Sequence, residues 1–180
     1  MGVAVAKRAW TENGMVEDVS AGLEIGFGSG ENLAVNEFER RYTGGCLCGA
    51  LRYEAVGEPL YTGQCYCTDC QKASGSGFIP FLGFLSTAVR FSGGTRQIRT
   101  KAARGGEAVC NFCPICGSLV FGGEIGKTDS FTIYAGSLDD PSSFYPKVAI
   151  FARSRPHWAI IPSELTVFEE MPPQDRPQQN

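Results

Sequence analysis

The sequence has a single histidine, no long hydrophobic run and no excess of basic residues. Its most apolar stretch, Phe78–Val89, is shorter than the roughly 18 residues of a membrane-spanning helix and is interrupted by Pro80 and Gly83. Lys and Arg total 16 against 19 Asp and Glu, which gives a formal net charge of −3. This balance argues against a protein that binds nucleic acid through a basic surface. We therefore expect neither a membrane nor a nucleic-acid partner.

The beginning of the chain also lacks the long apolar centre of a secretory signal. We accordingly expect a cytoplasmic location, where thiols stay reduced. The sequence contains eight cysteines. In a reducing compartment, clustered cysteines are more typical of metal sites than of disulfides.

The length of 180 residues suits one domain with appended ends. Residues 1–40 include the glycine-rich run Gly22–Glu37, which has neither helical nor strand periodicity, and we predict a partly mobile N-terminal extension. Two interpretations of this extension stay open: a loosely attached arm, or an arm that contacts a second copy of the chain in a homodimer. Residues 41–170 are predicted to form the folded domain. Residues 171–180 are rich in Pro and Gln and are predicted to form a disordered tail.

Short segments with strand character fill the predicted domain, so the expected fold class is all-β. Leu51, Tyr53 and Ala55 alternate with polar residues, as a strand with one buried face requires. Further strands are predicted at Phe78–Leu85, Thr95–Thr100, Ser118–Gly122, Phe131–Ala135, Val148–Ala152 and Leu165–Phe168. The glycine pairs Gly44-Gly45, Gly93-Gly94, Gly105-Gly106 and Gly122-Gly123 are predicted in turns or bulges that need positive φ.

Helical signal is scarce in this sequence. Thr68–Ala73 predicts one or two helical turns that end at Gly75, and Ser137–Phe144 predicts a capped turn. The expected architecture is therefore mainly β with short helical turns.

Seven of the eight cysteines fall into three tight groups. The groups are Cys46 and Cys48; Cys65, Cys67 and Cys70; and Cys113 and Cys116. A disulfide across one intervening residue would close a strained ring, so this spacing favours metal binding. Thiolate ligands select zinc among the available divalent ions, and four of them form a closed structural site.

The first and third groups together supply four sulfurs and predict one tetrahedral zinc site. Gly49 and Gly117 directly follow the second cysteine of each group. A glycine there can adopt the positive φ that turns backbone N–H groups toward sulfur.

The central group supplies three sulfurs without an obvious fourth ligand. Three protein ligands and one open position are typical of catalytic zinc, because water or substrate must reach the ion. A fourth ligand from Cys110 or His157 would instead close the site and make it structural. Tyr134 lies in a predicted strand, and the sequence leaves open which face of the sheet it occupies.

The segments around these cysteines resemble the motifs of the glutathione-dependent formaldehyde-activating enzyme family, which also contains centromere protein V. The segments that carry the resemblance are Gly44–Tyr53, Cys65–Gly75, Phe112–Leu119, Ile133–Pro141 and Ser154–Trp158. The likeness covers residues 42–168, and several motifs in one order make it more specific than a single Cys-x-x-Cys.

The resemblance implies a β-tent fold of coiled β-sheets pinned by two zinc ions per chain. It implies a structural ion held by Cys46, Cys48, Cys113 and Cys116. It also implies a catalytic ion held by Cys65, Cys67 and Cys70. Cys110 does not belong to the family pattern.

The activity implied by the resemblance is that of a zinc-dependent carbon–sulfur lyase or thiol-adduct enzyme similar to S-(hydroxymethyl)glutathione synthase. Its partner would be a small thiol such as glutathione, or the adduct of that thiol with formaldehyde. Two other hypotheses stay open: a non-catalytic, zinc-stapled module that binds protein or chromatin, and a redox or metal-handling protein that uses the central thiols directly. The scarcity of basic residues weakens the chromatin-binding version.

Overall fold

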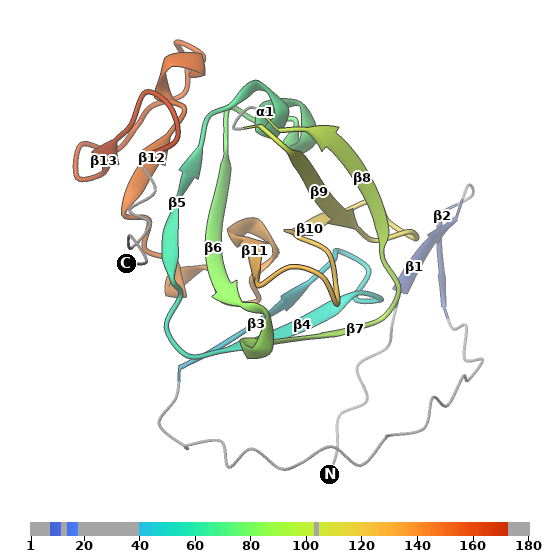
Figure 1. Ribbon diagram of the computed structural model, residues 1–180. Helices are drawn as coiled ribbons and strands as arrows, with labels where there is room; N and C mark the ends of the chain where they lie inside the picture. Colours follow the sequence, from blue (N-terminus) through green and yellow to red (C-terminus); the bar gives the residue numbers. More distant parts are fainter. Residues whose placement is uncertain (1–7, 12–13, 18–39, 103–104, 173–180) are drawn as a thin grey trace.

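The structure is a computed structural model that describes residues 8–11, 14–17, 40–102 and 105–172 (Figure 1). Strands β1 (Arg8–Thr11) and β2 (Gly14–Glu17) form an antiparallel hairpin, which the sequence did not predict. Most of the predicted N-terminal extension and of the predicted C-terminal tail lies outside the described residues. The mobility of the extension, its role in a dimer and the disorder of the tail therefore stay predictions.

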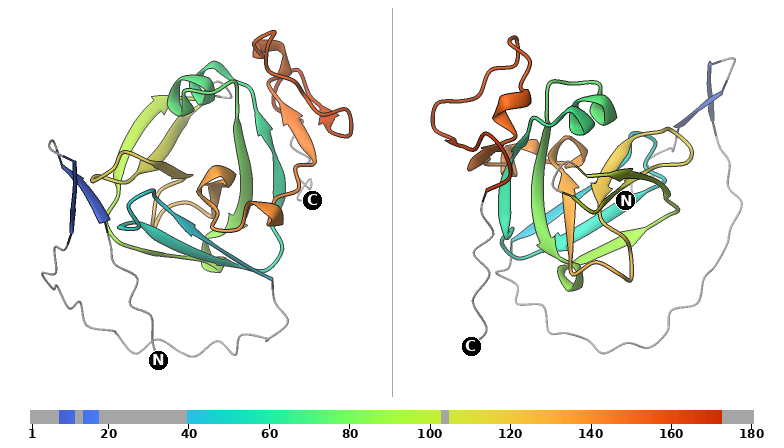
Figure 2. Two further views of the ribbon diagram at one scale, coloured as in Figure 1. Left: turned by 180° about the vertical axis from the view of Figure 1, so that it is seen from behind. Right: turned by 45° about the horizontal axis from the view of Figure 1, so that its top comes forward.

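Two sheets form the body of the molecule, one of eight strands and one of three (Figures 1 and 2). In spatial order, the large sheet contains β13 (Thr166–Val167), β12 (Val148–Ile150), β5 (Tyr61–Cys65), β6 (Ile79–Leu85), β11 (Ser130–Tyr134), β10 (Leu119–Gly122), β9 (Glu107–Phe112) and β8 (Arg96–Lys101). The small sheet contains β3 (Arg41–Gly45), β4 (Arg52–Val56) and β7 (Val89–Ser92). All neighbours pair antiparallel except β12, which runs parallel to both β5 and β13.

Helical structure is confined to short segments in the part of the chain that the structure describes. These are the helix α1 (Thr68–Ser74) and the 3-10 turns η1 (Ser86–Ala88), η2 (Ala135–Ser137), η3 (Pro141–Ser143) and η4 (Ala152–Ser154). None of the helices in the described ranges is long and apolar enough to cross a membrane. The predicted all-β fold class with short helical turns is confirmed.

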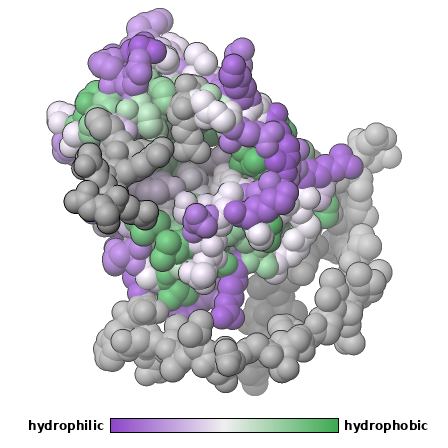
Figure 3. Space-filling model, viewed as in Figure 1, coloured by the Kyte–Doolittle hydropathy of each residue, from purple (hydrophilic) through white to green (hydrophobic). Residues whose placement is uncertain are grey.

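The main core lies between the two sheets. The small sheet contributes side chains such as Tyr53 and Ala55, which alternate with the outward-facing Arg52 and Glu54, as predicted for this strand. The large sheet contributes a second layer of buried residues, namely Leu82, Phe84, Val120, Phe121, Phe131 and Ile133. Viewed from the same side as Figure 1, the surface shows polar and apolar residues interspersed rather than one continuous apolar area (Figure 3).

The prediction of a positive-φ turn at Gly44-Gly45 is wrong. Both residues lie inside β3, and neither has positive φ. A Cβ on Gly44 would lie 2.2 Å from the carbonyl oxygen of Ser137 and 2.2 Å from the Tyr53 hydroxyl. Glycine is required there because another segment packs directly against the strand.

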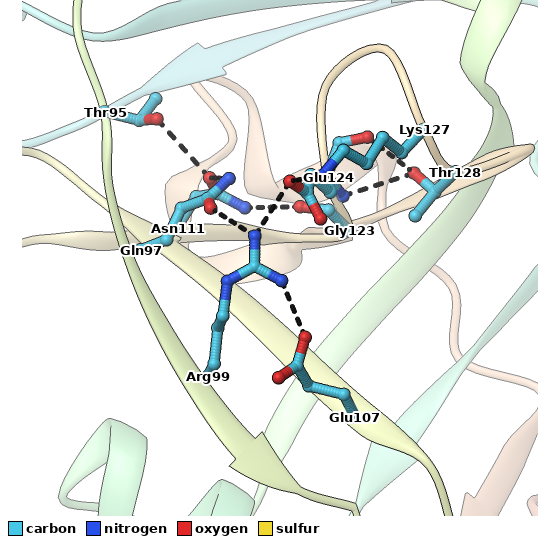
Figure 4. Close-up of polar contacts among 9 residues, drawn as sticks. All are labelled: Thr95, Gln97, Arg99, Glu107, Asn111, Gly123, Glu124, Lys127 and Thr128. Atoms are coloured by element: carbon cyan, nitrogen blue, oxygen red, sulfur yellow. Dashed lines mark hydrogen bonds and ion pairs between the residues drawn. The ribbon is translucent and has the colours of Figure 1, made fainter.

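A buried polar side chain holds the β8–β9–β10 end of the large sheet together (Figure 4). The side chain of Asn111 in β9 is fully buried, and its Nδ2 donates to the carbonyl oxygens of Gly123, at 2.6 Å, and Phe121, at 3.4 Å. Its Oδ1 accepts hydrogen bonds from Gln97 and Thr95 at 3.3 and 3.4 Å. On the surface beside it, Arg99 forms ion pairs with Glu107 and Glu124 (Figure 4).

The pairing of β9 with β10 is interrupted by a register shift between Leu119 and Phe121. The extra residue is Val120, and both Val120 and Phe121 are fully buried. Such a bulge bends the strand and turns two successive side chains into the core. It lies where the chain returns from the third cysteine group into the sheet.

Candidate metal centres

The first and third cysteine groups meet at the edge of the main core. Cys46 and Cys48 follow β3, and Cys113 and Cys116 lie in the turn that joins β9 to β10. All four Sγ atoms lie within 4.8 Å of one another. Cys46 and Cys113 are themselves buried members of the main core.

The two turns that carry these cysteines have the predicted local geometry. Gly49 and Gly117 have φ values of 77° and 72°, which confirms the expected left-handed conformation. The backbone N–H of Leu51 donates to the Cys46 sulfur at 3.2 Å, and that of Ile115 donates to the Cys113 sulfur at 3.4 Å. These N–H groups stabilise negative charge on the sulfurs.

The spacing of the four sulfurs fits a tetrahedral zinc ion. A Zn–S bond of about 2.3 Å in a regular tetrahedron separates neighbouring sulfurs by about 3.8 Å. The Sγ of Cys48 lies 3.5 Å from that of Cys46 and 3.7 Å from that of Cys113. This group can therefore hold a metal ion with four protein ligands.

The second group lies at the end of β5 and the start of α1. Cys65 is the last residue of β5, Cys67 is the N-cap of α1, and Cys70 lies in its first turn. The Cys67 sulfur accepts a hydrogen bond from the Cys70 backbone N–H at 3.4 Å, as an N-cap side chain does. The helix begins at Thr68 and is capped by Gly75 with φ 65°, both as predicted.

The three sulfurs of this group also lie within 4.8 Å of one another. Their ionisation is strongly unequal without a cation. Hydrogen bonds from the Cys65 and Cys70 thiols lower the pKa of Cys67 to about 2, while the hydrogen bond to Cys67 raises the pKa of Cys65 to about 12. The hydrogen bonds to Cys65 and Cys67 likewise raise the pKa of Cys70. Three thiolates this close repel one another, and a divalent cation would compensate their charge.

Within the described residues, neither Cys110 nor His157 joins this three-sulfur group. Cys110 lies in β9, and its sulfur accepts a hydrogen bond from the Tyr134 hydroxyl at 3.3 Å. The group is packed instead against apolar side chains, among them Phe81 of β6 and Ile150 of β12. Apolar walls limit the access of water to the sulfurs on these sides.

A cavity of ≈ 400 Å³ lies between α1 and the turn of the third cysteine group. Ser74 of α1 lines it one helical turn after Cys70, and Ser118 and Ser137 contribute further hydroxyls. Tyr134 of β11 lines the same cavity. A space of this size accommodates a small thiol or peptide-sized ligand.

The sequence did not predict this cavity, because its lining comes from four separate segments of the chain. The signal that was visible is the alternation in residues 130–134. Phe131 and Ile133 are buried in the core, while Thr132 and Tyr134 lie on the opposite face of β11. That alternation settles the face of Tyr134 once the core face is known.

Comparison with known families gave one match. A family model described as glutathione-dependent formaldehyde-activating enzyme matches residues 41–154, which is more than half of the chain. The matched range contains all three cysteine groups. A comparison with curated proteins found no match.

Proposed function

Because the chain belongs to the glutathione-dependent formaldehyde-activating enzyme family, we propose that it makes or breaks the carbon–sulfur bond of a small thiol adduct. The reacting site in this proposal is the group Cys65, Cys67 and Cys70. The four-sulfur group is proposed to hold a structural zinc ion and the three-sulfur group a catalytic one. The proposed substrate is a glutathione-like thiol or its adduct with formaldehyde, and the proposed location is the cytoplasm, where thiols stay reduced.

The difference between the two sulfur groups carries the proposal. One group offers four ligands at the edge of the main core, and the other offers three beside a helix whose next turn lines a cavity. A structural ion is surrounded by protein ligands, whereas a catalytic ion keeps one position for a substrate. This difference in the number of sulfurs supports a structural role for the first group and a catalytic role for the second.

Zinc at such a site stabilises a bound thiol as thiolate and polarises an oxygen of the substrate. In the synthetic direction, the thiol sulfur forms a bond to the carbon of formaldehyde. The π bond of the C=O group breaks, and the thiol proton passes to the oxygen. In the reverse direction the same bonds change in the opposite sense. No oxidant or reductant is needed.

The chain's own residues would orient the substrate. The hydroxyls of Ser74, Ser118 and Ser137 line the cavity. Those of Ser74 and Ser137 donate to the carbonyl oxygens of Cys70 and Tyr134, and their oxygens can accept hydrogen bonds from the amide N–H groups of a peptide-like thiol. The apolar side chains of Phe81 and Ile150 keep one side of the sulfur group dry. A thiolate in such a poorly hydrated place interacts more strongly with its cation.

The test is turnover by protein of known metal content. Glutathione and formaldehyde are mixed with zinc-loaded protein, and exchange between the free thiol and its adduct is followed by NMR. We expect exchange above the uncatalysed rate for the intact chain and loss of this enhancement in Cys70→Ser. Lys72→Gln, an exposed substitution in the same helix, is the control for zinc content.

Absence of turnover for a panel of thiol adducts, in protein that carries both ions, would refute the catalytic proposal. The non-catalytic, zinc-stapled interaction module would then be the better hypothesis. Catalysis by protein stripped of metal would refute the role of zinc.

A further inference from the structure

Tyr134 lies on the same face of the large sheet as Cys65. In the strand register, Cys65 of β5 is opposite Ile79 of β6, and Tyr134 of β11 is opposite Phe81 of β6. Ile79 and Phe81 are two residues apart, so their side chains point to the same face. Tyr134 also shares the lining of the cavity with Ser74, which lies one helical turn after Cys70.

A glycine leaves the space that the Tyr134 side chain needs to reach its hydrogen-bond partner. The phenol crosses β10 to reach the sulfur of Cys110 in β9, at 3.3 Å. A Cβ on Gly122 of β10 would lie 3.1 Å from the Tyr134 hydroxyl oxygen, closer than an ordinary contact. The small residue therefore leaves room for the hydroxyl group on this face.

The partner of the Tyr134 hydroxyl is a weak one. A thiol sulfur accepts hydrogen bonds less strongly than an oxygen does, and the structure gives this hydroxyl no oxygen partner among the described residues. Since the side chain also lines the cavity of ≈ 400 Å³, a ligand there can offer the hydroxyl a better acceptor. Replacement of the Cys110 sulfur by a ligand oxygen as the acceptor would strengthen the hydrogen bond and leave the Tyr134 ring in place.

The phenol is also suited to donate rather than to accept a proton. Burial raises the pKa of Tyr134 above its ordinary value. The group therefore keeps its proton at neutral pH and offers a fixed donor at the wall of the cavity.

We propose that Tyr134 is the hydrogen-bond donor to the oxygen of the thiol–aldehyde adduct, and that Cys110 is a positioning residue that holds its hydroxyl when the cavity is empty. This inference rests on the function proposed above. While the S–C bond forms and the thiol proton passes to the oxygen, the tyrosine keeps its own proton. Its hydrogen bond stabilises the negative charge that builds up on the oxygen.

The experiment compares two ligands of equal size in variants that change one hydroxyl or one sulfur. The ligands are S-(hydroxymethyl)glutathione, kept in equilibrium with formaldehyde, and S-ethylglutathione, which has a methyl group in place of the hydroxyl. Their dissociation constants are measured by calorimetry on zinc-loaded protein, together with NMR exchange rates. The matched control is Tyr61→Phe, because the Tyr61 hydroxyl bonds Thr132 and Tyr61 lies at the other end of β5 from Cys65.

Tyr134→Phe is expected to reduce the preference for the hydroxymethyl ligand by roughly tenfold and the exchange rate by about 100-fold, with binding of the ethyl ligand unchanged. Tyr61→Phe is expected to change neither the ligand preference nor the exchange rate. Cys110→Ala removes the resting partner but keeps the donor, so most of the preference is expected to remain. A purely structural tyrosine–cysteine pair would instead give similar losses in Tyr134→Phe and Cys110→Ala.

The inference is overturned if Tyr134→Phe keeps the preference, or if it weakens both ligands equally. If the intact, zinc-loaded chain and Tyr134→Phe turn over the adduct at the same rate, the donor role of Tyr134 is refuted and the proposed function stands. An intact chain that binds neither ligand and gives no turnover refutes the proposed function, and the donor with it.

Discussion

Removal of one sulfur from each cysteine group should have very different consequences for the fold. In Cys113→Ser we expect loss of the cooperative folded state, whereas Cys70→Ser should lose about one zinc ion per chain and remain folded. Cys113 is fully buried and belongs to the main core between the two sheets, where the first and third groups meet. Cys70 packs against a separate, smaller cluster that contains Phe81 and Ile150.

The magnitude follows from comparing two free energies. Binding of a structural zinc ion contributes about 10–16 kcal/mol in small zinc domains at neutral pH. The net stability of a folded domain is about 5–15 kcal/mol. Loss of the four-sulfur ion therefore removes a free energy as large as the whole stability, while the main core does not depend on the three-sulfur group.

The assay combines zinc content, measured by elemental analysis, with a thermal melt followed by circular dichroism. Two zinc ions per chain are expected for the intact protein and about one for a folded Cys70→Ser. Cys110→Ser is the control for zinc content, because it removes a thiol that lies outside both groups. If Cys70→Ser lost both ions or melted with the same loss of structure as Cys113→Ser, the second ion would be structural and the enzymatic proposal would lose its main support.

Three further changes test the fold around the site. Gly44→Ala places a Cβ 2.2 Å from the carbonyl oxygen of Ser137, and we expect a loss of about 1–3 kcal/mol in unfolding free energy by urea denaturation; an unchanged midpoint would show that the two segments separate freely. Asn111→Leu leaves buried carbonyl oxygens without a donor and should cost about 1–3 kcal/mol in the same assay, with a stable variant contradicting the assigned hydrogen bonds. The hydrogen bond from Arg52 lowers the pKa of Asp139, so its contribution is present above the ordinary pKa of an aspartate and is lost as the pH falls through the lower, folded-state value. Because both side chains are more than a third exposed, Asp139→Asn should cost less than about 1 kcal/mol at pH 7 and progressively less as the pH falls below the ordinary pKa of an aspartate, and a loss that did not change with pH would contradict the ion pair.

The cysteine spacing predicted the three local groups, because ligands one to three residues apart can face one ion. The union of the first and third groups followed from counting ligands, since four thiolates complete a tetrahedral site. The strands with alternating or strongly apolar residues, such as β4 and β6, were predicted because a hydrophobic pattern is visible within a few neighbouring residues. The strand β5 was missed because its buried positions include polar residues. Thr62 donates to the carbonyl oxygen of Tyr145 at 2.8 Å, and Gln64 accepts from the Tyr66 hydroxyl at 2.7 Å. The first partner is distant in the sequence, and the second depends on one particular side chain. A hydrophobic pattern indicates neither.

The end of β12 shows a second limit of sequence patterns. The apolar run predicts a strand through Ala152, but β12 ends at Ile150 and Phe151 has a φ of 56°. A left-handed conformation at a bulky residue is unfavourable by itself. Here it is accompanied by tertiary hydrogen bonds, since the N–H groups of Phe151 and Ala152 donate to the carbonyl oxygens of Glu170 and Phe168, which follow β13. Local sequence carries no record of these bonds.

The dimensions of α1 connect cation loading to substrate recognition. A seven-residue helix is too short to persist on its own in water, and none of its residues is buried. The helix is held by its two caps, the first of which is the sulfur of the proposed ligand Cys67, and by Gln71, whose side-chain amide donates to the carbonyl oxygens of Tyr66 and Ser154. A cation shared by Cys65, Cys67 and Cys70 would tie the start of the helix to the end of β5 and so fix Ser74 in the cavity wall. Cation loading should therefore sharpen discrimination among thiols as well as supply the chemistry.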